Sequence, residues 1–308
     1  MPISAGRDPH PLVDRIEGLI QEDVGRNLGP LFAAARGGLR RAAAALARGR
    51  PGQIGLITGF YVPKGAPPAA ETDGPIGAAL LARGFAEIGL ACRLATDAPC
   101  RNTCAAALAA AGAAAVPVDS VEIGAPLAGL VETWRQAGVA AAIAIERCGK
   151  SADGRPRNMR GEDISDYTAP LDELFAAGPW CTIAIGDGGN EIGMGALPRA
   201  LIAAHVALGA AIACVTPAQH LIVAGVSNWG AYGLLGALAV MREDWRARLL
   251  PCLDETLDRH VLETTIRDGP AVDGVSRLPT PTVDNLPIAV HHEKLRRIRA
   301  IAAAADGP

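Results

Sequence analysis

From Gln53 onward, short apolar runs alternate with alanine-rich segments whose apolar residues recur at helical spacing. The runs with the length of buried strands are Ile54–Thr58, Cys92–Thr96, Ala114–Val118, Ala141–Ile145, Thr182–Ile185, Ala211–Val215 and Leu221–Ala224. Because these runs are apolar throughout and are connected through helices, they predict parallel strands that are covered on both faces. We therefore predict an α/β fold with a doubly wound, mainly parallel sheet and helices on both faces.

Helical segments separate several of these strands and also occupy both ends of the chain. The internal candidates are Ile76–Ile88, Asn102–Ala111, Pro126–Gln136, Glu191–Ala207 and Trp229–Met241. Helical spacing also extends over the residues before Gly49 and over two later segments, Leu249–Ile266 and Pro287–Ala304. This pattern predicts helical extensions at both termini of the sheet.

The domain organisation follows from the positions of these segments. A chain of 308 residues can form one large domain or two small ones. Because we see no internal repeat and no long low-complexity linker, we predict a single α/β domain over residues 1–308. It consists of a helical arm (1–50), a sheet core (53–245) and C-terminal helices (246–308). The alternative is a two-lobed arrangement with a break near residues 149–163.

Charge, hydropathy and cysteine content limit the class of protein. The formal net charge is −3 and the basic residues are spread along the chain, so no basic stripe predicts a nucleic-acid partner. No apolar run reaches the roughly 18 residues that a membrane span needs, and no signal peptide precedes the first helix, which predicts a cytoplasmic protein. The seven cysteines predict buried thiols, with a metal shared by Cys100 and Cys104 as the alternative. Assembly as a homo-oligomer is left open.

Ligands of open parallel sheets collect beyond the carboxyl ends of the strands, so the loops after the predicted strands are candidates for a site. The first such loop ends in Glu71-Thr72-Asp73-Gly74-Pro75, which opens a helix. Thr72 or Asp73 can cap that helix, and Pro75 suits its first turn. Capping does not explain the second carboxylate, Glu71, and we predict Asp73 as a catalytic residue.

The second loop follows the strand that ends at Ile145 and carries charges of both signs. It begins with Glu146 and Arg147 and continues to Asn158 and Arg160. The planar fork of an arginine binds a carboxylate through two hydrogen bonds, so the loop is a candidate cradle for a zwitterion. We predict Glu146 as a catalytic residue and Arg147, Asn158 and Arg160 as substrate-binding residues.

The third loop, Gly186–Gly195, is the most specific and holds five glycines in ten residues. Glycines let the backbone approach a ligand closely, and a helix beginning near Glu191 would supply free N–H donors. The loop lacks the GxGxxG order and a Walker lysine, so it does not predict a nucleotide site. Asp187 and Glu191 are predicted to be catalytic. The predicted substrate-binding residues of this loop are Gly188, Gly189 and Asn190. A tight turn that satisfies its own backbone donors is the alternative.

The fourth loop, Ala224–Gly230, again follows a strand and begins a helix. Ser227 or Asn228 can cap that helix, and we predict that both also bind substrate. A serine nucleophile is the weaker alternative, because the G-x-S-x-G elbow is missing. Four later residues are expected to close the same cleft: Asp273, Gly274, Asp284 and Asn285.

Five segments together resemble the C-terminal domain of the D-glutamate cyclase family. They are Glu71–Gly77 (ETDGPIG), Ala144–Ile164 (AIERCGKSADGRPRNMRGEDI), Thr168–Phe175 (TAPLDELF), Ile185–Gly195 (IGDGGNEIGMG) and His220–Gly230 (HLIVAGVSNWG). The match extends over roughly Gly55 to His291, and a string as long as GDGGNEIGMG is far more specific than a lone glycine motif. The resemblance implies conversion of D-glutamate to 5-oxo-D-proline and water, a hydro-lyase step in D-amino-acid breakdown. Larger family members carry a separate N-terminal domain, which we do not expect in this chain.

The implied reaction needs a base, an acid and a group that polarises the γ-carboxyl. The amine attacks the γ-carboxyl carbon of the same molecule, so holding the folded conformer supplies much of the effect. We predict Glu191 or Asp187 as the base for the ammonium, and Glu146 or Asp73 as the acid for the departing oxygen. An arginine of the second loop, or a divalent ion, would polarise the γ-carboxyl.

Two other functions stay open on the sequence. In a metal-assisted hydrolase or lyase acting on a small carboxylate, a divalent cation such as Mg²⁺ or Mn²⁺ would bind Asp73, Glu146, Asp187 and Glu191. The second possibility is a non-catalytic module that binds an acidic amino acid. Each function needs a small-molecule ligand and requires the four loops to meet over one edge of the sheet.

Overall fold

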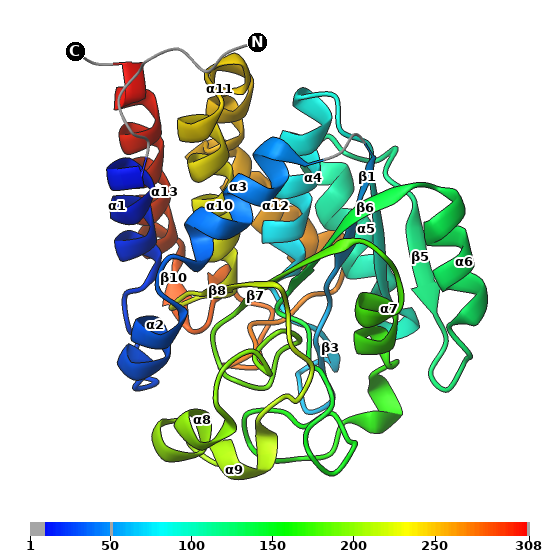
Figure 1. Ribbon diagram of the computed structural model, residues 1–308. Helices are drawn as coiled ribbons and strands as arrows, with labels where there is room; N and C mark the ends of the chain where they lie inside the picture. Colours follow the sequence, from blue (N-terminus) through cyan, green and yellow to red (C-terminus); the bar gives the residue numbers. More distant parts are fainter. Residues whose placement is uncertain (1–9, 50–51, 307–308) are drawn as a thin grey trace.

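The computed structural model describes residues 10–49 and 52–306 of the chain. Its centre is a six-stranded sheet in the order β5-β4-β1-β6-β7-β8, with parallel pairing throughout (Figure 1). The strands are β1 (Gln53–Ile57), β4 (Cys92–Asp97), β5 (Val118–Val121), β6 (Val139–Ile145), β7 (Cys181–Gly186) and β8 (His220–Val223). Counted along the chain, this is the strand order 3-2-1-4-5-6 of a doubly wound sheet, as predicted.

Alternate residues of the central strands face two different cores. Ile143 and Ile145 of β6 belong to one core, whereas Ala142 and Ala144 belong to the other. The helices of the first core are α1 (His10–Ile20), α3 (Gly38–Arg48), α4 (Pro75–Glu87), α5 (Arg101–Ala110), α10 (Ser227–Met241), α11 (Glu243–Leu249), α12 (Glu255–Asp268) and α13 (Ile288–Ala303). The helices of the second core are α2 (Gly29–Ala35), α6 (Ala128–Gln136), α7 (Leu171–Ala177), α8 (Arg199–His205) and α9 (Gly209–Ile212). Cover on both faces explains why the strands are apolar throughout.

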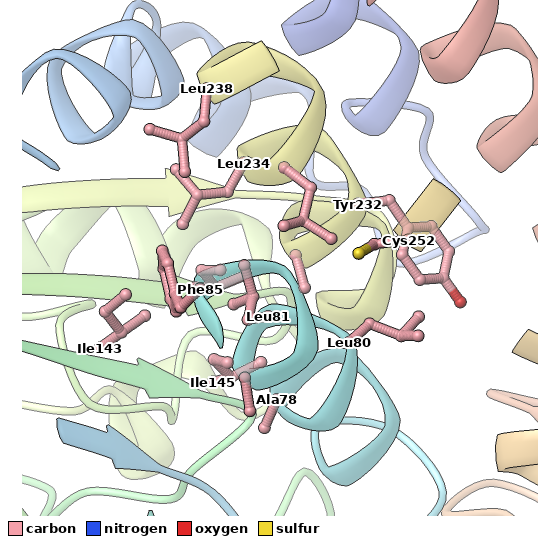
Figure 2. Packing of buried hydrophobic residues seen from close by; sticks show 14 of the residues in the cluster. Ala78, Leu80, Leu81, Phe85, Ile143, Ile145, Tyr232, Leu234, Leu238 and Cys252 are labelled. Atoms are coloured by element: carbon pink, nitrogen blue, oxygen red, sulfur yellow. The ribbon is translucent and has the colours of Figure 1, made fainter. Parts of the chain in front are cut away.

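Helices α4 and α10 form the centre of the first core. Leu81 and Phe85 of α4 share a cluster with Ile143 of β6, and Leu234 and Leu238 of α10 lie beside them (Figure 2). Helix α10 is buried along nearly its whole length, as expected for a helix that is apolar on all sides. The packing therefore fixes the first turns of both helices at the carboxyl edge of the sheet.

Two short hairpins carry further residues of the candidate site. Strand β2 (Tyr61–Val62) pairs with β3 (Ala69–Ala70), and β9 (Thr282–Val283) pairs with β10 (Leu286–Pro287). The turn between β9 and β10 consists of Asp284 and Asn285, whose φ angles are +55° and +59°. A two-residue type I′ turn requires such left-handed conformations, and Asp and Asn tolerate them better than most residues.

Two of the predicted internal elements are wrong. Ala211–Val215 is not a strand, because the chain forms helix α9 there and leaves it at Ala213. The predicted helix Glu191–Ala207 is helical only from Arg199, where α8 begins. Residues 187–198 form an irregular loop instead, in which Gly189 and Gly193 both have φ angles of +101° that a right-handed helix does not contain.

The predicted helical extensions are present at both ends of the sheet, with different boundaries. Leu249–Ile266 is not one helix: a 3₁₀ turn at Leu250–Cys252 separates α11 from α12, because Pro251 interrupts the chain there. Strand β5 begins at Val118 rather than Ala114. Within the predicted arm, residues 1–9 and 50 lie outside the described residues. Over residues 10–49 and 52–306, no helix is both long enough and apolar enough to cross a bilayer.

Candidate active site

The predicted site loops meet at the carboxyl edge of the sheet, beside the neighbouring strands β1 and β6. The strand order reverses at this point, because β1 continues to β4 and β5 while β6 continues to β7 and β8. Doubly wound sheets bind their ligands in the crevice at such a point. Glu146 directly follows β6, Asp187 directly follows β7, and Ser227 begins α10 shortly after β8.

A cavity of about 270 Å³ lies at this edge, and its polar lining has two parts. The first part, here called the acidic floor, consists of Glu71, Glu146, Asp187 and Asp284, together with Asp73 next to them. The second part, here called the basic rim, consists of Lys64, Arg160 and Arg277. The carboxyl groups of the floor are buried, whereas Lys64 and Arg160 are exposed. The cavity therefore presents anionic groups inside and mainly cationic groups at its mouth, where Glu162 pairs with Lys64.

The structure brings together three of the four predicted catalytic carboxylates. One oxygen each of Asp73, Glu146 and Asp187 lies within 4.8 Å of the other two, and all three residues are buried. They come from the first, second and third loops, which are far apart in the sequence. Like charges at this separation repel strongly in a buried site, so the cluster requires protons or a cation.

The first turn of α10 holds this cluster in place. The backbone N–H of Ser227 donates to Asp73 Oδ2 at 2.9 Å and to Asp187 Oδ2 at 3.1 Å. The hydroxyl of Ser227 donates to Glu146 Oε2 at 2.6 Å. A helix N-terminus carries free N–H groups and a partial positive charge, so it stabilises carboxylates placed there.

Two unusual backbone conformations let the first and second loops approach each other. Glu146 has a φ angle of +42°, which is uncommon for a residue with a side chain, and Gly74 has a φ angle of +92°. A Cβ atom on Gly74 would lie 2.6 Å from Thr58 Oγ1 and 2.8 Å from the Cβ of Glu146. Only glycine therefore allows the loop of Asp73 to lie against Glu146.

Arg26 is the cation that pairs with the acidic floor. Its Nη1 lies 2.5 Å from Asp187 Oδ1, and its Nη2 lies 2.8 Å from Asp284 Oδ1. It reaches the floor from the segment between α1 and α2, where Asp23 Oδ1 accepts hydrogen bonds from the N–H groups of Gly25 and Arg26. The N-terminal arm thus contributes a charged group to the cavity.

Burial raises the pKa values of the floor carboxyl groups. The pKa values of Glu71, Asp73 and Glu146 lie well above their ordinary range because of burial, and repulsion by neighbouring carboxylates adds to this effect. Burial also raises the pKa of Asp187, and raises that of Asp284 to about 7, although Arg26 lowers both. The floor therefore combines carboxyl groups with raised pKa values and carboxylates that Arg26 stabilises, a combination that suits acid–base catalysis.

Comparison with known proteins shows which family the chain resembles. A family model described as D-glutamate cyclase-like, C-terminal, matches residues 16–299, which is most of the chain. The chain belongs to this family. The mitochondrial D-glutamate cyclase of Homo sapiens is 42% identical to it over 103 residues, which are 32% of the chain and 17% of the human protein. The matched segment thus spans less than a fifth of that relative.

In this family member, Glu191 supports the third loop and does not line the cavity. Its carboxylate accepts hydrogen bonds from the N–H groups of Asp187 (3.0 Å), Gly188 (2.5 Å) and Gly189 (2.6 Å). The predicted helix start at Glu191 is absent, since α8 begins only at Arg199. With its oxygens engaged by backbone donors, Glu191 is not available as a base, and we no longer assign it that role.

The predicted substrate-binding residues of the third loop also lie away from the cavity lining. Gly188 and Gly189 donate to Glu191, and the side chain of Asn190 donates to the carbonyl of Arg157 at 2.9 Å. All three residues are buried. Their backbone holds Asp187 in place, so the glycines serve a tight turn beside the site, as the alternative for this loop proposed.

Arg147 is buried among protein groups rather than exposed to a ligand. It is 1% exposed, and its guanidinium donates to the carboxylate of Asp97, to the carbonyl of Gly59 at 2.8 Å and to the carbonyl of Ala169 at 2.6 Å. This network ties the end of β4 to the chain segments that follow β1 and β6. Because it does not line the cavity, we no longer assign Arg147 to substrate binding.

The remaining predicted binding residues divide into two groups. Asn158 and Arg160 line the cavity, and Asn158 Oδ1 accepts hydrogen bonds from the N–H groups of Arg160 and Glu162, both at 3.0 Å. Asn158 therefore shapes the loop that presents Arg160. Ser227 and Asn228 are fully buried and bind the carboxylates of the floor.

The sequence prediction included Arg160 but missed the other cations that line the cavity, above all Arg26. This residue lies in the arm, far along the chain from Asp187 and Asp284, and no local motif marks it. Lys64 and Arg277 of the rim were missed for the same reason. The available signal was the polar segment Gln21–Asn27 between two helices, whose turn residues predict a loop without indicating where it points.

Proposed function

We propose that the chain catalyses a D-glutamate cyclase-like hydro-lyase reaction, in which D-glutamate forms 5-oxo-D-proline and water. The observation that carries this proposal is a small cavity that combines a buried acidic floor with a basic rim at the switch point of the sheet. Family membership supports the same reaction, because the human relative of the matched segment is a D-glutamate cyclase.

The charge distribution of the cavity suits an amino acid with two carboxylates. Ionised carboxylates of the floor attract an α-ammonium group, and the cations Arg160 and Arg277 of the rim offer partners for the substrate carboxylates. Lys64 already pairs with Glu162 at the same rim. A cavity of about 270 Å³ suits a ligand of this size better than a nucleotide. The substrate is therefore proposed to bind with its amine toward the floor.

The reaction moves two protons from the substrate nitrogen to the oxygen that leaves as water. The nitrogen forms a bond with the γ-carbon, and the bond between that carbon and one γ-oxygen breaks. Glu146 is proposed to protonate this oxygen, since burial raises its pKa and its Oε2 is held by the hydroxyl of Ser227 at 2.6 Å. Holding the folded conformer of the substrate supplies much of the remaining rate enhancement.

A divalent cation, Mg²⁺ or Mn²⁺, is a second proposed component of the site. The supporting observation is that oxygens of Asp73, Glu146 and Asp187 lie within 4.8 Å of one another. Carboxylate oxygens are the ligands that these ions prefer, so the residues present fit such a cation. When bound, the ion would polarise the γ-carboxyl in place of the proton on Glu146.

Proton NMR of D-glutamate incubated with the chain tests the reaction. Signals of 5-oxoproline are expected to appear, and L-glutamate in a separate sample measures the stereochemical preference. Glu146→Gln is expected to lower turnover about 100-fold or more, because it removes the acid. Asp258→Asn is the control, since Asp258 is a buried carboxylate that accepts a hydrogen bond from Tyr232 and does not line the cavity. No 5-oxoproline from D-glutamate, with or without Mg²⁺ or Mn²⁺, would contradict the proposal.

A melting-temperature measurement alongside the NMR assay separates the enzyme from a non-catalytic module that binds an acidic amino acid. A specific ligand raises the melting temperature whether or not it reacts. Stabilisation by D-glutamate without product would favour the binding module. Cytoplasmic location, a homo-oligomeric state and the absence of a nucleic-acid partner stay predictions.

A further inference from the structure

Asp284 occupies the tip of a hairpin that points into the cavity. Its left-handed backbone conformation is the one that the two-residue turn between β9 and β10 requires. The neighbouring N–H of Asn285 donates to Asp273 Oδ2 at 2.7 Å, and the hydroxyl of Thr72 donates to the carbonyl of Thr282 at 3.0 Å. The hairpin is thus anchored to the loop after α12 and to the first site loop, which fixes the position of the Asp284 carboxylate.

The two oxygens of Asp284 differ in their surroundings. Oδ1 pairs with Arg26 Nη2 at 2.8 Å, whereas Oδ2 is buried and has no hydrogen-bond partner among the described residues. The side chain is 7% exposed and lines the cavity. A buried oxygen without a donor is costly unless a ligand supplies one. Oδ2 is therefore the oxygen that is ready to accept a proton from a bound substrate.

The other carboxylates of the floor are less suited to that role. Asp187 is engaged through both oxygens, by Arg26 and by the N–H of Ser227. Asp73 accepts backbone hydrogen bonds through both of its oxygens as well. Glu71 forms no ion pair with the residues that the structure describes, and burial raises its pKa well above the ordinary value, which favours its protonated form.

The groups that face Asp284 set its proton affinity. Burial raises its pKa to about 7, repulsion by Asp187 and Asp273 acts in the same direction, and Arg26 opposes both. Glu71 and Asp73 from the first loop and His291 from α13 also interact with it electrostatically. A base whose pKa lies close to the working pH combines a large ionised fraction with a useful proton affinity.

We propose that Asp284 is the general base that removes protons from the α-ammonium of the substrate. This inference rests on the proposed cyclisation. Oδ2 takes one proton from the ammonium, the freed nitrogen lone pair forms the bond to the γ-carbon, and Glu146 protonates one γ-oxygen. The bond between the carbon and that oxygen then breaks as the oxygen receives the second proton of the nitrogen and leaves as water. The proton on Asp284 returns to Glu146, which restores both groups. Arg26 favours the ionised form of the carboxylate before the transfer, and its contact with Oδ1 leaves Oδ2 free.

The test compares wild type, Asp284→Asn, Asp284→Glu and the Asp258→Asn control in pH profiles of 5-oxoproline formation from D-glutamate. Wild-type activity is expected to rise with pH through about 7, where Asp284 ionises. Asp284→Asn is expected to lose about 100-fold or more in kcat. Asp284→Glu keeps a base on a longer side chain and is expected to retain part of the activity. The acid limb of its profile, where activity increases with pH, is expected to have a different midpoint from that of wild type. The control is expected to match wild type.

A binding measurement separates loss of the base from loss of the fold. The melting temperature of Asp284→Asn is expected to rise on addition of 5-oxo-D-proline, as for wild type. The proposal is overturned if Asp284→Asn keeps kcat within about threefold of wild type, or keeps the acid limb near pH 7. Loss of ligand stabilisation together with activity overturns it as well, because Asp284 would then act in folding or binding. An inactive wild type instead rejects the cyclisation itself and the base with it.

Discussion

Asp73 and Asn228 cap each other's helices across the candidate site. The carboxylate of Asp73 accepts hydrogen bonds from the N–H groups of Ser227 (2.9 Å) and Asn228 (2.8 Å) in the first turn of α10. In return, Oδ1 of Asn228 accepts hydrogen bonds from the N–H groups of Gly74 (3.0 Å) and Gly77 (2.8 Å) in the first turn of α4. The exchange satisfies buried helix-end donors and couples the first and fourth loops.

Replacing Asn228 with alanine is expected to destabilise the protein by about 2–4 kcal/mol. The reason is that the buried N–H of Gly77 loses its acceptor, and the N–H of Gly74 keeps only its longer bond to Asp73 Oδ1 at 3.1 Å. Urea unfolding of the variant measures the change. Asn102→Ala is the control, because Asn102 is an exposed residue near the start of α5 and is expected to change stability by less than about 0.5 kcal/mol. Equal stability of the two variants would contradict the capping role.

Replacing Glu191 with glutamine is expected to act on stability rather than on proton transfer. The amide presents an NH₂ group toward the backbone donors of Asp187, Gly188 and Gly189, so the free energy of unfolding is expected to fall by about 2–3 kcal/mol. Thermal unfolding should show this loss, while the pH profile of turnover keeps its wild-type midpoint. Glu122→Gln changes an exposed carboxylate and serves as the control. A displaced midpoint in Glu191→Gln would restore the original assignment of Glu191 to catalysis.

The strands of the core were predictable because they lie between two layers of helices. Ile143 and Ala144 face different cores, so the whole run of β6 is apolar and is recognisable without knowledge of its neighbours. The same criterion fails for Ala211–Val215, since a short apolar run fits a buried helix as well as a strand. Helix α9 forms there, and only the packing of the chain around it decides between the two.

The location of the candidate site in the fold was predictable, but the contacts that its side chains make were not. Loops after parallel strands converge at a switch point, which is why Asp73, Glu146 and Asp187 meet as predicted. The side-chain roles depend on contacts that local sequence does not encode. Arg147 and Arg160 looked equivalent in the second loop, yet one is buried against Asp97 and the other faces the cavity mouth.

Stability is expected to decrease as the pH rises from 5 to 8. The pKa of Asp284 is about 7 in the folded protein and near 4 in the unfolded chain, so the folded state binds more protons between these values. The resulting contribution is fully present below pH 4 and is lost as the pH rises through 7, at about 1 kcal/mol per pH unit in this window. Burial also raises the pKa values of Glu71, Asp73 and Glu146, which adds contributions of the same sign.

Urea unfolding at several pH values above 5 measures this slope. The ion-paired carboxylates Asp153, Glu162 and Asp163 have lowered pKa values, and their opposite contribution to stability falls below pH 5. Burial lowers the pKa values of His220 and His291, which reduces the slope within this range without reversing it. Asp284→Asn removes one titrating group and is expected to give a shallower slope than wild type. A free energy of unfolding that stays constant or increases between pH 5 and 8 would show that the floor is ionised throughout.

Mn²⁺ is expected to bind one site per chain and to bind more tightly at pH 8 than at pH 6. A cation at Asp73, Glu146 and Asp187 displaces the protons that their raised pKa values retain, so its affinity increases as those protons are lost. Isothermal titration calorimetry after treatment with a chelator measures stoichiometry and affinity. Asp187→Asn removes one ligand and is expected to weaken binding at least about 10-fold.

The control for this titration is Asp258→Asn, which removes a buried carboxylate outside the cluster and is expected to bind Mn²⁺ like wild type. Asp187→Asn also loses the charge partner of Arg26, so its melting temperature without metal separates a general loss of stability from the loss of a ligand. Unchanged Mn²⁺ affinity in this variant would place the ion elsewhere. If millimolar Mn²⁺ gives no heat of binding, the proposed cation site is wrong. Protons would then neutralise the acidic floor, and Glu146 would act as the acid in its protonated form.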